Sequence, residues 1–255
     1  NDSIWLGNDP SGTTDTAAEN VALGTTALDA ITTGDANTAI GYNALTALTS
    51  GPSNTAVGQY ALYDHTTQQC STAVGSYAGK NTNGGYNTYV GWGSGYSAAG
   101  GPQTGASNVA IGYKTMGGEN LTSGGSNVCV GREAGFSIAA GSNSTYIGAH
   151  AGYFVTGSKH AVVGAYALYA ANPNAGNVAV GYWALKACTS ADNTAVGYQA
   201  GLGVTSGTNN TLIGSEAGTA TSPSGDVTTG SNIVCFGNTN VTAAYVEIDA
   251  WTTSD

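Results

Sequence analysis

A glycine recurs through this chain at nearly constant spacing, and that period restricts the chain to a small set of folds. Successive repeat glycines are mostly 16 or 17 residues apart. Each lies within a similar short motif, as in NTAIGYNAL and NTAVGYQAG. A fixed period of this length predicts a solenoid in which each repeat forms one rung on the last. The repeat glycines are Gly7, Gly24, Gly41, Gly58, Gly75, Gly91, Gly112, Gly131, Gly148, Gly164, Gly181, Gly197, Gly214 and Gly237.

The residues before each glycine predict a short strand. The position directly before it is Leu, Ile or Val in thirteen of fourteen repeats, and the position three before it is Thr, Val or Ile in thirteen of fourteen. Residues two apart in a strand share a face, and β-branching suits strands. We therefore expect this pair to face a core. The intervening residue, often Ala, would then form a small face that a neighbouring backbone can approach.

We predict an all-β, elongated parallel β-solenoid or β-roll, or a triple β-helix, of about fourteen coils. Each coil would hold two short strands and two turns, and the rod would be about 65 Å long. Residues 1–237 would form one repetitive shaft and residues 238–255 a separate C-terminal segment. A thin solenoid buries little apolar surface, so we expect self-association along the small face. The period accommodates both chains that coil individually and chains that intertwine.

Asparagine stands four residues before the glycine in nine repeats. Stacked in register, these residues would form a ladder in which each amide bonds its equivalent one coil away. A plain turn preference of asparagine explains the pattern equally well. Neither interpretation makes these residues catalytic.

Composition excludes several classes of function. Five Lys and Arg against fifteen Asp and Glu give a net charge of −10, which disfavours binding to nucleic acid. No apolar run approaches a membrane span. Cys129 and Cys235 occupy the Ala position of the repeat, so we expect small buried hydrophobes there rather than ligands. His65, His150 and His160 share no metal-ligand spacing. We predict neither metal nor cofactor.

Catalytic residues are also not evident. Glycoside cleavage needs two carboxyl groups about 5 to 9.5 Å apart. Glu133 and Glu216 hold equivalent repeat positions, but five coils, about 24 Å, separate them. Asp64 and His65 are interpreted as a solvated turn. We therefore expect a protein that is not an enzyme.

Aromatic residues are the best functional lead. They directly follow the glycine or sit one position further on, and adjacent positions in a strand point to opposite faces. One set would pack inside or between subunits, and the other would be exposed. Exposed rings suit sugar binding, whereas packing or a subunit interface is the other interpretation. The first set is Tyr42, Trp92, Tyr113, Tyr182 and Tyr198; the second is Tyr60, Tyr77, Tyr166 and Trp183.

Three return segments are longer than the rest, after Gly91, Gly112 and Gly214. Insertions in solenoids emerge as loops, often on a binding face. The candidate receptor contacts in these loops are Tyr96, Gln103, Glu119 and Asn120.

The motif N-T-A-V-G-Y-x-A resembles repeats in the shafts of bacteriophage tail fibres and, more loosely, the heads of trimeric autotransporter adhesins. The segment NTNVTAAYVEIDAWTTSD resembles the junction between a fibre shaft and an endosialidase-type intramolecular chaperone, which trimerises the fibre and then cleaves itself off. In that family the cut falls at a Ser-Asp junction, which Ser254 and Asp255 match. A cleaved product would end at Ser254, so we expect a truncated or an uncut form here.

The resemblance implies a homotrimer in an extracellular virion tail that contacts other tail proteins and a host-cell glycan or receptor. A bacterial trimeric surface adhesin is one alternative. An ice-binding β-solenoid is another, and the expected burial of the Thr three residues before the glycine argues against it.

Overall fold

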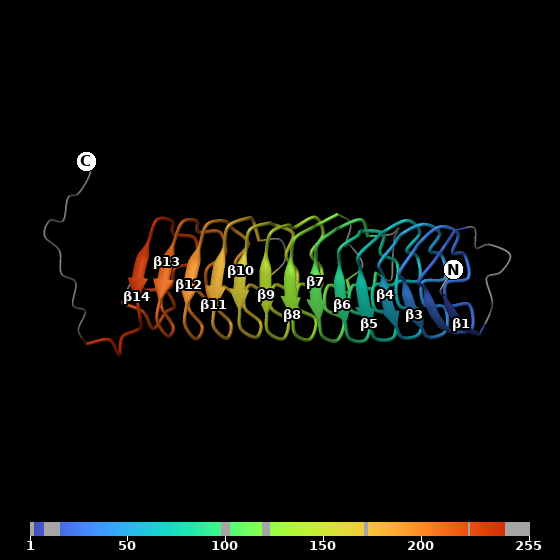
Figure 1. Ribbon diagram of the computed structural model, residues 1–255. Coiled ribbons are helices and arrows are strands. Elements are labelled where there is room, and N and C mark those ends of the chain that lie inside the picture. The colour runs from blue at the N-terminus through green and yellow to red at the C-terminus, as the bar shows by residue number, and fades with distance from the viewer. Residues whose placement is uncertain are drawn as a thin grey trace, which may run out of the picture.

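The chain forms one row of parallel strands, seen side by side along the rod in Figure 1. The computed structural model describes residues 3–7, 16–97, 103–118, 123–170, 173–223 and 225–242. Each strand pairs with those before and after it in sequence, so the chain coils on itself and the intertwined alternative does not hold. The strands are β1 (Ile4–Gly7), β2 (Val21–Gly24), β3 (Thr38–Ile40), β4 (Thr55–Val57), β5 (Thr72–Val74), β6 (Thr88–Val90), β7 (Val109–Ile111), β8 (Val128–Val130), β9 (Thr145–Ile147), β10 (Ala161–Val163), β11 (Val178–Val180), β12 (Thr194–Val196), β13 (Thr211–Ile213) and β14 (Val234–Phe236).

The strands lie where the repeat predicts them, but the face that is buried is the opposite of the predicted one. In β4, Ala56 is fully buried, whereas Thr55 and Val57 on either side are only half buried. The middle residue is the buried one in every strand from β2 to β14. The β-branched pair therefore faces outward, and the small Ala face is inside the coil and is not available to a neighbour. The prediction that the β-branched pair faces the core was wrong.

The reason lies on the far side of the coil. There the chain turns inward a second set of side chains, Ala three residues after the glycine and Leu or Gly one position later. Ala44 and Leu45 are both fully buried opposite β3. In this coil, they leave room for little more than the methyl group of Ala39 on the strand. Each coil also has one strand rather than the two predicted, among the described residues.

Some coils exchange volume between the two sides of the core. Tyr89 replaces Ala in β6 and Tyr146 replaces Ala in β9, and both rings are buried. In the same coils Gly95 and Gly152 replace the usual Leu. A Cβ at Gly95 would lie 2.2 Å from the Tyr89 ring, and one at Gly152 would lie 2.1 Å from the Tyr146 ring. A large residue on the strand thus requires a glycine opposite it.

The repeat glycines end the strands at a position that no other residue suits. Gly58 has φ +134°, and a Cβ there would lie 2.5 Å from the carbonyl oxygen of Gly75 in the next coil. Glycine supplies both the backbone angle and the close approach. A second glycine row, missed in the sequence, lies seven residues before the first and includes Gly34 and Gly51. A Cβ at Gly51 would lie 1.8 Å from the carbonyl oxygen of Gln68.

The asparagine ladder is confirmed, and it is buried. The backbone N–H of Asn54 donates to Oδ1 of Asn37 at 2.9 Å, and the N–H of Ser71 donates to Oδ1 of Asn54 at 3.0 Å. Nδ2 of Asn54 donates onward to the carbonyl of Gln68 at 2.8 Å. Each asparagine thereby satisfies backbone groups of the next coil that would otherwise be buried without partners.

Candidate functional site

Aromatic side chains gather along the corner that directly follows the strands. At this corner the backbone continues the ladder beyond the strand: the N–H of Tyr60 donates to the carbonyl of Tyr42, and the N–H of Trp183 donates to that of Ala165. The second residue after the glycine takes a left-handed conformation, with φ 58° at Tyr60 and 60° at Trp183. The strand alternation ends there, so both aromatic positions lie outside the coil, held on a hydrogen-bonded ladder.

The expected division of the two aromatic sets is therefore only partly met. Residues directly after the glycine are exposed; Tyr198, for example, is 50% exposed. Residues one position later, such as Tyr60 and Trp183, are half buried against neighbouring rings. Neither set enters the core of the coil.

The first aromatic cluster follows β3 to β7. Its rings touch in sequence from coil to coil, with centroids of Tyr60 and Tyr77 5.2 Å apart and those of Trp92 and Tyr113 5.3 Å apart, both pairs stacked. Offset stacking at this separation stabilises the row. The first aromatic cluster consists of Tyr42, Tyr60, Tyr63, Tyr77, Trp92, Tyr96 and Tyr113.

Two lysines stand over the first aromatic cluster. Nζ of Lys80 lies 4.9 Å from the ring centre of Tyr60 and 5.2 Å from that of Tyr77. Nζ of Lys114 lies 5.6 Å from the ring centre of Trp92. Both are cation–π contacts. Among the described residues, neither lysine forms an ion pair with a carboxylate.

The second aromatic cluster follows β8 to β12 and has a different electrostatic setting. Oε2 of Glu133 lies 3.1 Å from Nδ1 of His150, and the His150 ring stacks on Tyr166 with centroids 4.8 Å apart. Burial, with a smaller contribution from Glu133, raises the pKa of Tyr153. The second aromatic cluster consists of Phe136, His150, Tyr153, Phe154, Tyr166, Tyr169, Tyr182, Trp183 and Tyr198.

The outward face of the sheet borders this corner and combines aliphatic residues with Thr. Val74, Ile111, Ile147 and Ile213 are each about 40% exposed. No charged residue occupies either outward position of any strand from β1 to β14. We call this surface the outer sheet face. Its Thr residues also point outward, which removes the argument from burial against ice binding.

The four predicted receptor contacts fall in different places. Tyr96 is half buried, belongs to the first aromatic cluster and has its ring centre 5.7 Å from that of Tyr77. Gln103 is only 5% exposed, so its side chain faces the interior rather than the surface. Glu119 and Asn120 lie outside the described residues, as do Ser254 and Asp255.

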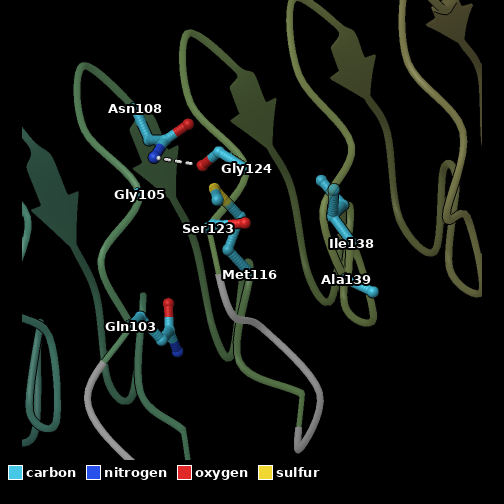
Figure 2. A pocket seen from close by; sticks show the side chains of 8 residues that line it. All are labelled: Gln103, Gly105, Asn108, Met116, Ser123, Gly124, Ile138 and Ala139. Carbon is cyan, nitrogen blue, oxygen red and sulfur yellow. Dashed lines mark hydrogen bonds between the residues drawn. The ribbon is translucent and has the colours of Figure 1, made fainter.

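Gln103 lines the small pocket shown in Figure 2. The pocket lies between successive coils, and Nδ2 of Asn108 donates to the carbonyl of Gly124 across it at 3.0 Å. Nε2 of Gln103 has no hydrogen-bond partner among the described residues. The pocket is lined by ladder and core residues such as Met116 and Ile138, and among its described lining residues the hydroxyl of Ser123 stands without an acid or a base beside it.

Two histidines are buried within the coil. His65 was expected in a solvated turn, but it is fully buried, and its Nδ1 lies 2.8 Å from the carbonyl of Thr82. His160 replaces asparagine in the ladder, where its Nδ1 accepts the N–H of Asn177 at 3.2 Å. Burial lowers the pKa of each to about 4. Cys129 and Cys235 are buried as expected.

The sequence reasoning missed the lysines over the rings and the pairing of Glu133 with His150. A signal was available for the second of these. Glu133 and His150 stand at the same repeat position in successive coils, and so do Tyr166 and Trp183 after them. Residues at equivalent positions of a solenoid are neighbours along its axis.

The described residues include no group of three or more His, Cys, Asp or Glu that could hold a metal ion. They also include no helix long and apolar enough to span a membrane. No family model, curated protein or solved structure matches the chain.

Proposed function

We propose that this chain is the shaft of a homotrimeric bacteriophage tail fibre or spike that binds a host-cell surface glycan without catalysing a reaction. The observation that carries the proposal is the aromatic corner, where two ring clusters are held on a rigid ladder and their outermost members are 41% to 50% exposed. Flat rings with polar tips suit stacking on sugar rings. The resemblance of the repeats and of residues 238–255 to tail fibres adds the virion setting.

The outer sheet face supports the homotrimer. Fourteen strands spaced by about 4.8 Å, each about 10 Å wide, give a face of roughly 650 Å². This area is somewhat smaller than the roughly 800 Å² per partner that a standard interface buries. It is larger than the exposed patches of a few hundred Å² that monomers usually carry. The outer sheet face thus replaces the small Ala face as the surface through which we expect the chains to associate.

A charge on the outer sheet face tests the homotrimer. Val74→Lys with Ile111→Lys is expected to shift the mass in analytical ultracentrifugation from trimer towards monomer, because a lysine there would be buried unpaired. The matched control is Asn143→Lys, at a position where the following repeat carries Lys159. A wild-type chain that sediments as a monomer at every concentration would contradict the proposal.

Aromatic truncation tests recognition. Trp92→Ala and Tyr182→Ala are each expected to reduce binding to host cells or to a glycan array by tenfold or more, while the trimer mass and melting temperature stay near wild type. Tyr86→Ala is the control, because Tyr86 is also exposed but lies before its strand rather than at the aromatic corner. Unchanged binding in both corner variants would overturn the assignment.

Ice binding is the second candidate, favoured by the outward Thr. Seven strands place a Thr on the outer sheet face, in Thr38, Thr55, Thr72, Thr88, Thr145, Thr194 and Thr211. The neighbouring outward position, however, is Leu, Ile, Val or Phe in every strand. Thermal hysteresis in the wild-type chain, lost in Thr55→Lys, would favour this candidate over the adhesive one.

A further inference from the structure

We propose that the first aromatic cluster binds an acidic polysaccharide, with sugar rings stacked on the aromatic side chains and the carboxylate or sulfate groups paired with Lys80 and Lys114. This inference rests on the proposed function, since it names the class of glycan. It starts from the positions of the few cationic side chains. The sequence has only five Lys and Arg residues, and three of them, Lys80, Lys114 and Lys186, stand over aromatic rings.

Carboxylates lie at both corners of the coil, and Glu133 and Glu216 hold the second position after their glycines. Exposed carboxylates such as Glu19, Asp35 and Asp192 lie at the corner before the strand. Lys80 and Lys114 lie at the corner after it. The chain as a whole repels anions, so the cluster is a local exception. A polyanion would therefore be held best at the first aromatic cluster, where Lys80 and Lys114 stand over the rings.

The two lysines are half buried against the rings, and neither ammonium group pairs with a carboxylate of the described residues. Nζ of Lys80 lies within 5.7 Å of four ring centres, those of Tyr60, Tyr63, Tyr77 and Tyr96, and Nζ of Lys114 lies within 5.7 Å of Trp92 and Tyr113. Cation–π contact leaves the N–H donors of lysine free for an anion. The nearby carboxylate of Asp64 accepts the N–H of Asn81 at 3.1 Å. A ligand carboxylate would thus meet an unpaired ammonium beside a ring.

The cluster is also long enough for a polymer. Its contacts run without interruption from Tyr42 to Tyr113, over the corners that follow β3 to β7. Trp92 and Tyr113 are more than 40% exposed. The second aromatic cluster differs, because it has one lysine over a ring, Lys186 over Trp183, and also a carboxylate, Glu133, whose Oε2 lies 3.1 Å from Nδ1 of His150. We assign acidic selectivity to the first cluster alone.

The experiment compares charged polysaccharides with uncharged counterparts of the same backbone. Polygalacturonate and its methyl ester form one pair; a sulfated galactan and its desulfated form make another. Isothermal titration of the full chain is expected to show tighter binding to the charged member of at least one pair. Lys80→Gln and Lys114→Gln should each lower that affinity about fivefold. Both should leave affinity for the uncharged member unchanged.

Matched variants separate the lysine effect from loss of packing. Lys159→Gln removes a lysine from the other corner and is expected to change neither affinity. Trp92→Ala should weaken both members of a pair. Equal affinity for charged and uncharged members, or a charged-to-uncharged ratio that Lys80→Gln and Lys114→Gln leave intact, would overturn acidic selectivity while glycan binding stands. No binding to any polysaccharide in the set would overturn both.

Discussion

The coils that carry β2 to β4 and those that carry β6 and β9 share one backbone but fill their cores differently. In the first group an Ala on the strand faces a Leu on the return, as in Ala39 and Leu45. In the second group Tyr89 and Tyr146 on the strand face Gly95 and Gly152. The comparison teaches that a large side chain on one side of the core is accommodated by a glycine on the other side, so the residue at each core position can vary.

The largest expected effect comes from breaking one of these exchanges. Tyr89→Ala should lower the free energy of unfolding by about 3–5 kcal/mol, because the ring leaves a cavity. Gly95→Leu alone should also destabilise, since its side chain would collide with the Tyr89 ring. The double variant restores the Ala–Leu pair of the regular coils and should recover part of the loss in urea denaturation. A double variant less stable than both single variants would contradict the exchange.

The next largest effect is a loss of stability at low pH, caused by His160 in the asparagine ladder. His160 has an ordinary pKa of 6.5 when unfolded and a pKa of about 4 in the coil. The unfolded chain therefore binds the proton first, so stability is complete above pH 6.5 and falls by up to about 3 kcal/mol as the pH drops to 4. Burial lowers the pKa of His65 to about 4 as well, so His65 contributes a loss of stability over the same pH range.

His160→Asn restores the residue of the regular coils and tests this sign. Melting temperature measured from pH 7 to pH 4 should fall less steeply in the variant than in the wild type. Equal slopes would show that His160 does not contribute to acid sensitivity.

A smaller loss of stability is expected when one asparagine of the ladder is replaced. Asn54→Ala leaves the buried N–H of Ser71 and the carbonyl of Gln68 without their side-chain partners, which should cost about 1–3 kcal/mol. The exposed Asn143 provides a control, since Ala36 occupies the same repeat position with φ 56°. Asn143→Ala should stay within about 1 kcal/mol in the same denaturation assay.

The smallest expected effect is a gain in stability. Ser71 and Ser144 stand at ladder positions where the other coils have mostly asparagine. Ser71→Asn adds an amide donor towards the next coil and should stabilise by about 0.5–1 kcal/mol. A lower melting temperature in this variant would show that serine is required at that rung.

Periodicity predicted the strand positions, the coil stacking and the asparagine ladder, because each depends on spacing alone. It did not predict which face of the strand is buried. Side-chain alternation requires only that the residues flanking Ala56 share a face, and the choice of face depends on what the return segment places inside. Tyr89 occurs with Gly95 and Tyr146 with Gly152 in the sequence, but Gly79 and Gly201 occur with Ala, so the pattern became interpretable only in the folded coil.

The candidate site was predicted in part for the same reason. The aromatic positions follow from the repeat, and they lie at one corner as equivalent positions must. That both adjacent positions point outward depends on the left-handed backbone at Tyr60 and Trp183, which strand geometry does not anticipate. Lys80 and Lys114 hold different repeat positions, so only the folded corner brings each over its rings.

The exchange of Tyr89 with Gly95 also bears on how such a chain folds correctly. Near-identical repeats can pair with the wrong neighbour, because skipping a whole coil preserves almost every backbone bond and every buried Ala. Tyr89, by contrast, also packs against the coil before its own: a Cβ at Gly79 would lie 2.8 Å from the Tyr89 ring, so a preceding coil with Leu at that position would collide with the ring. The coils with a buried Tyr therefore favour the correct pairing of neighbouring coils during folding. A chain made only of the regular repeat would be expected to pair its coils incorrectly more often.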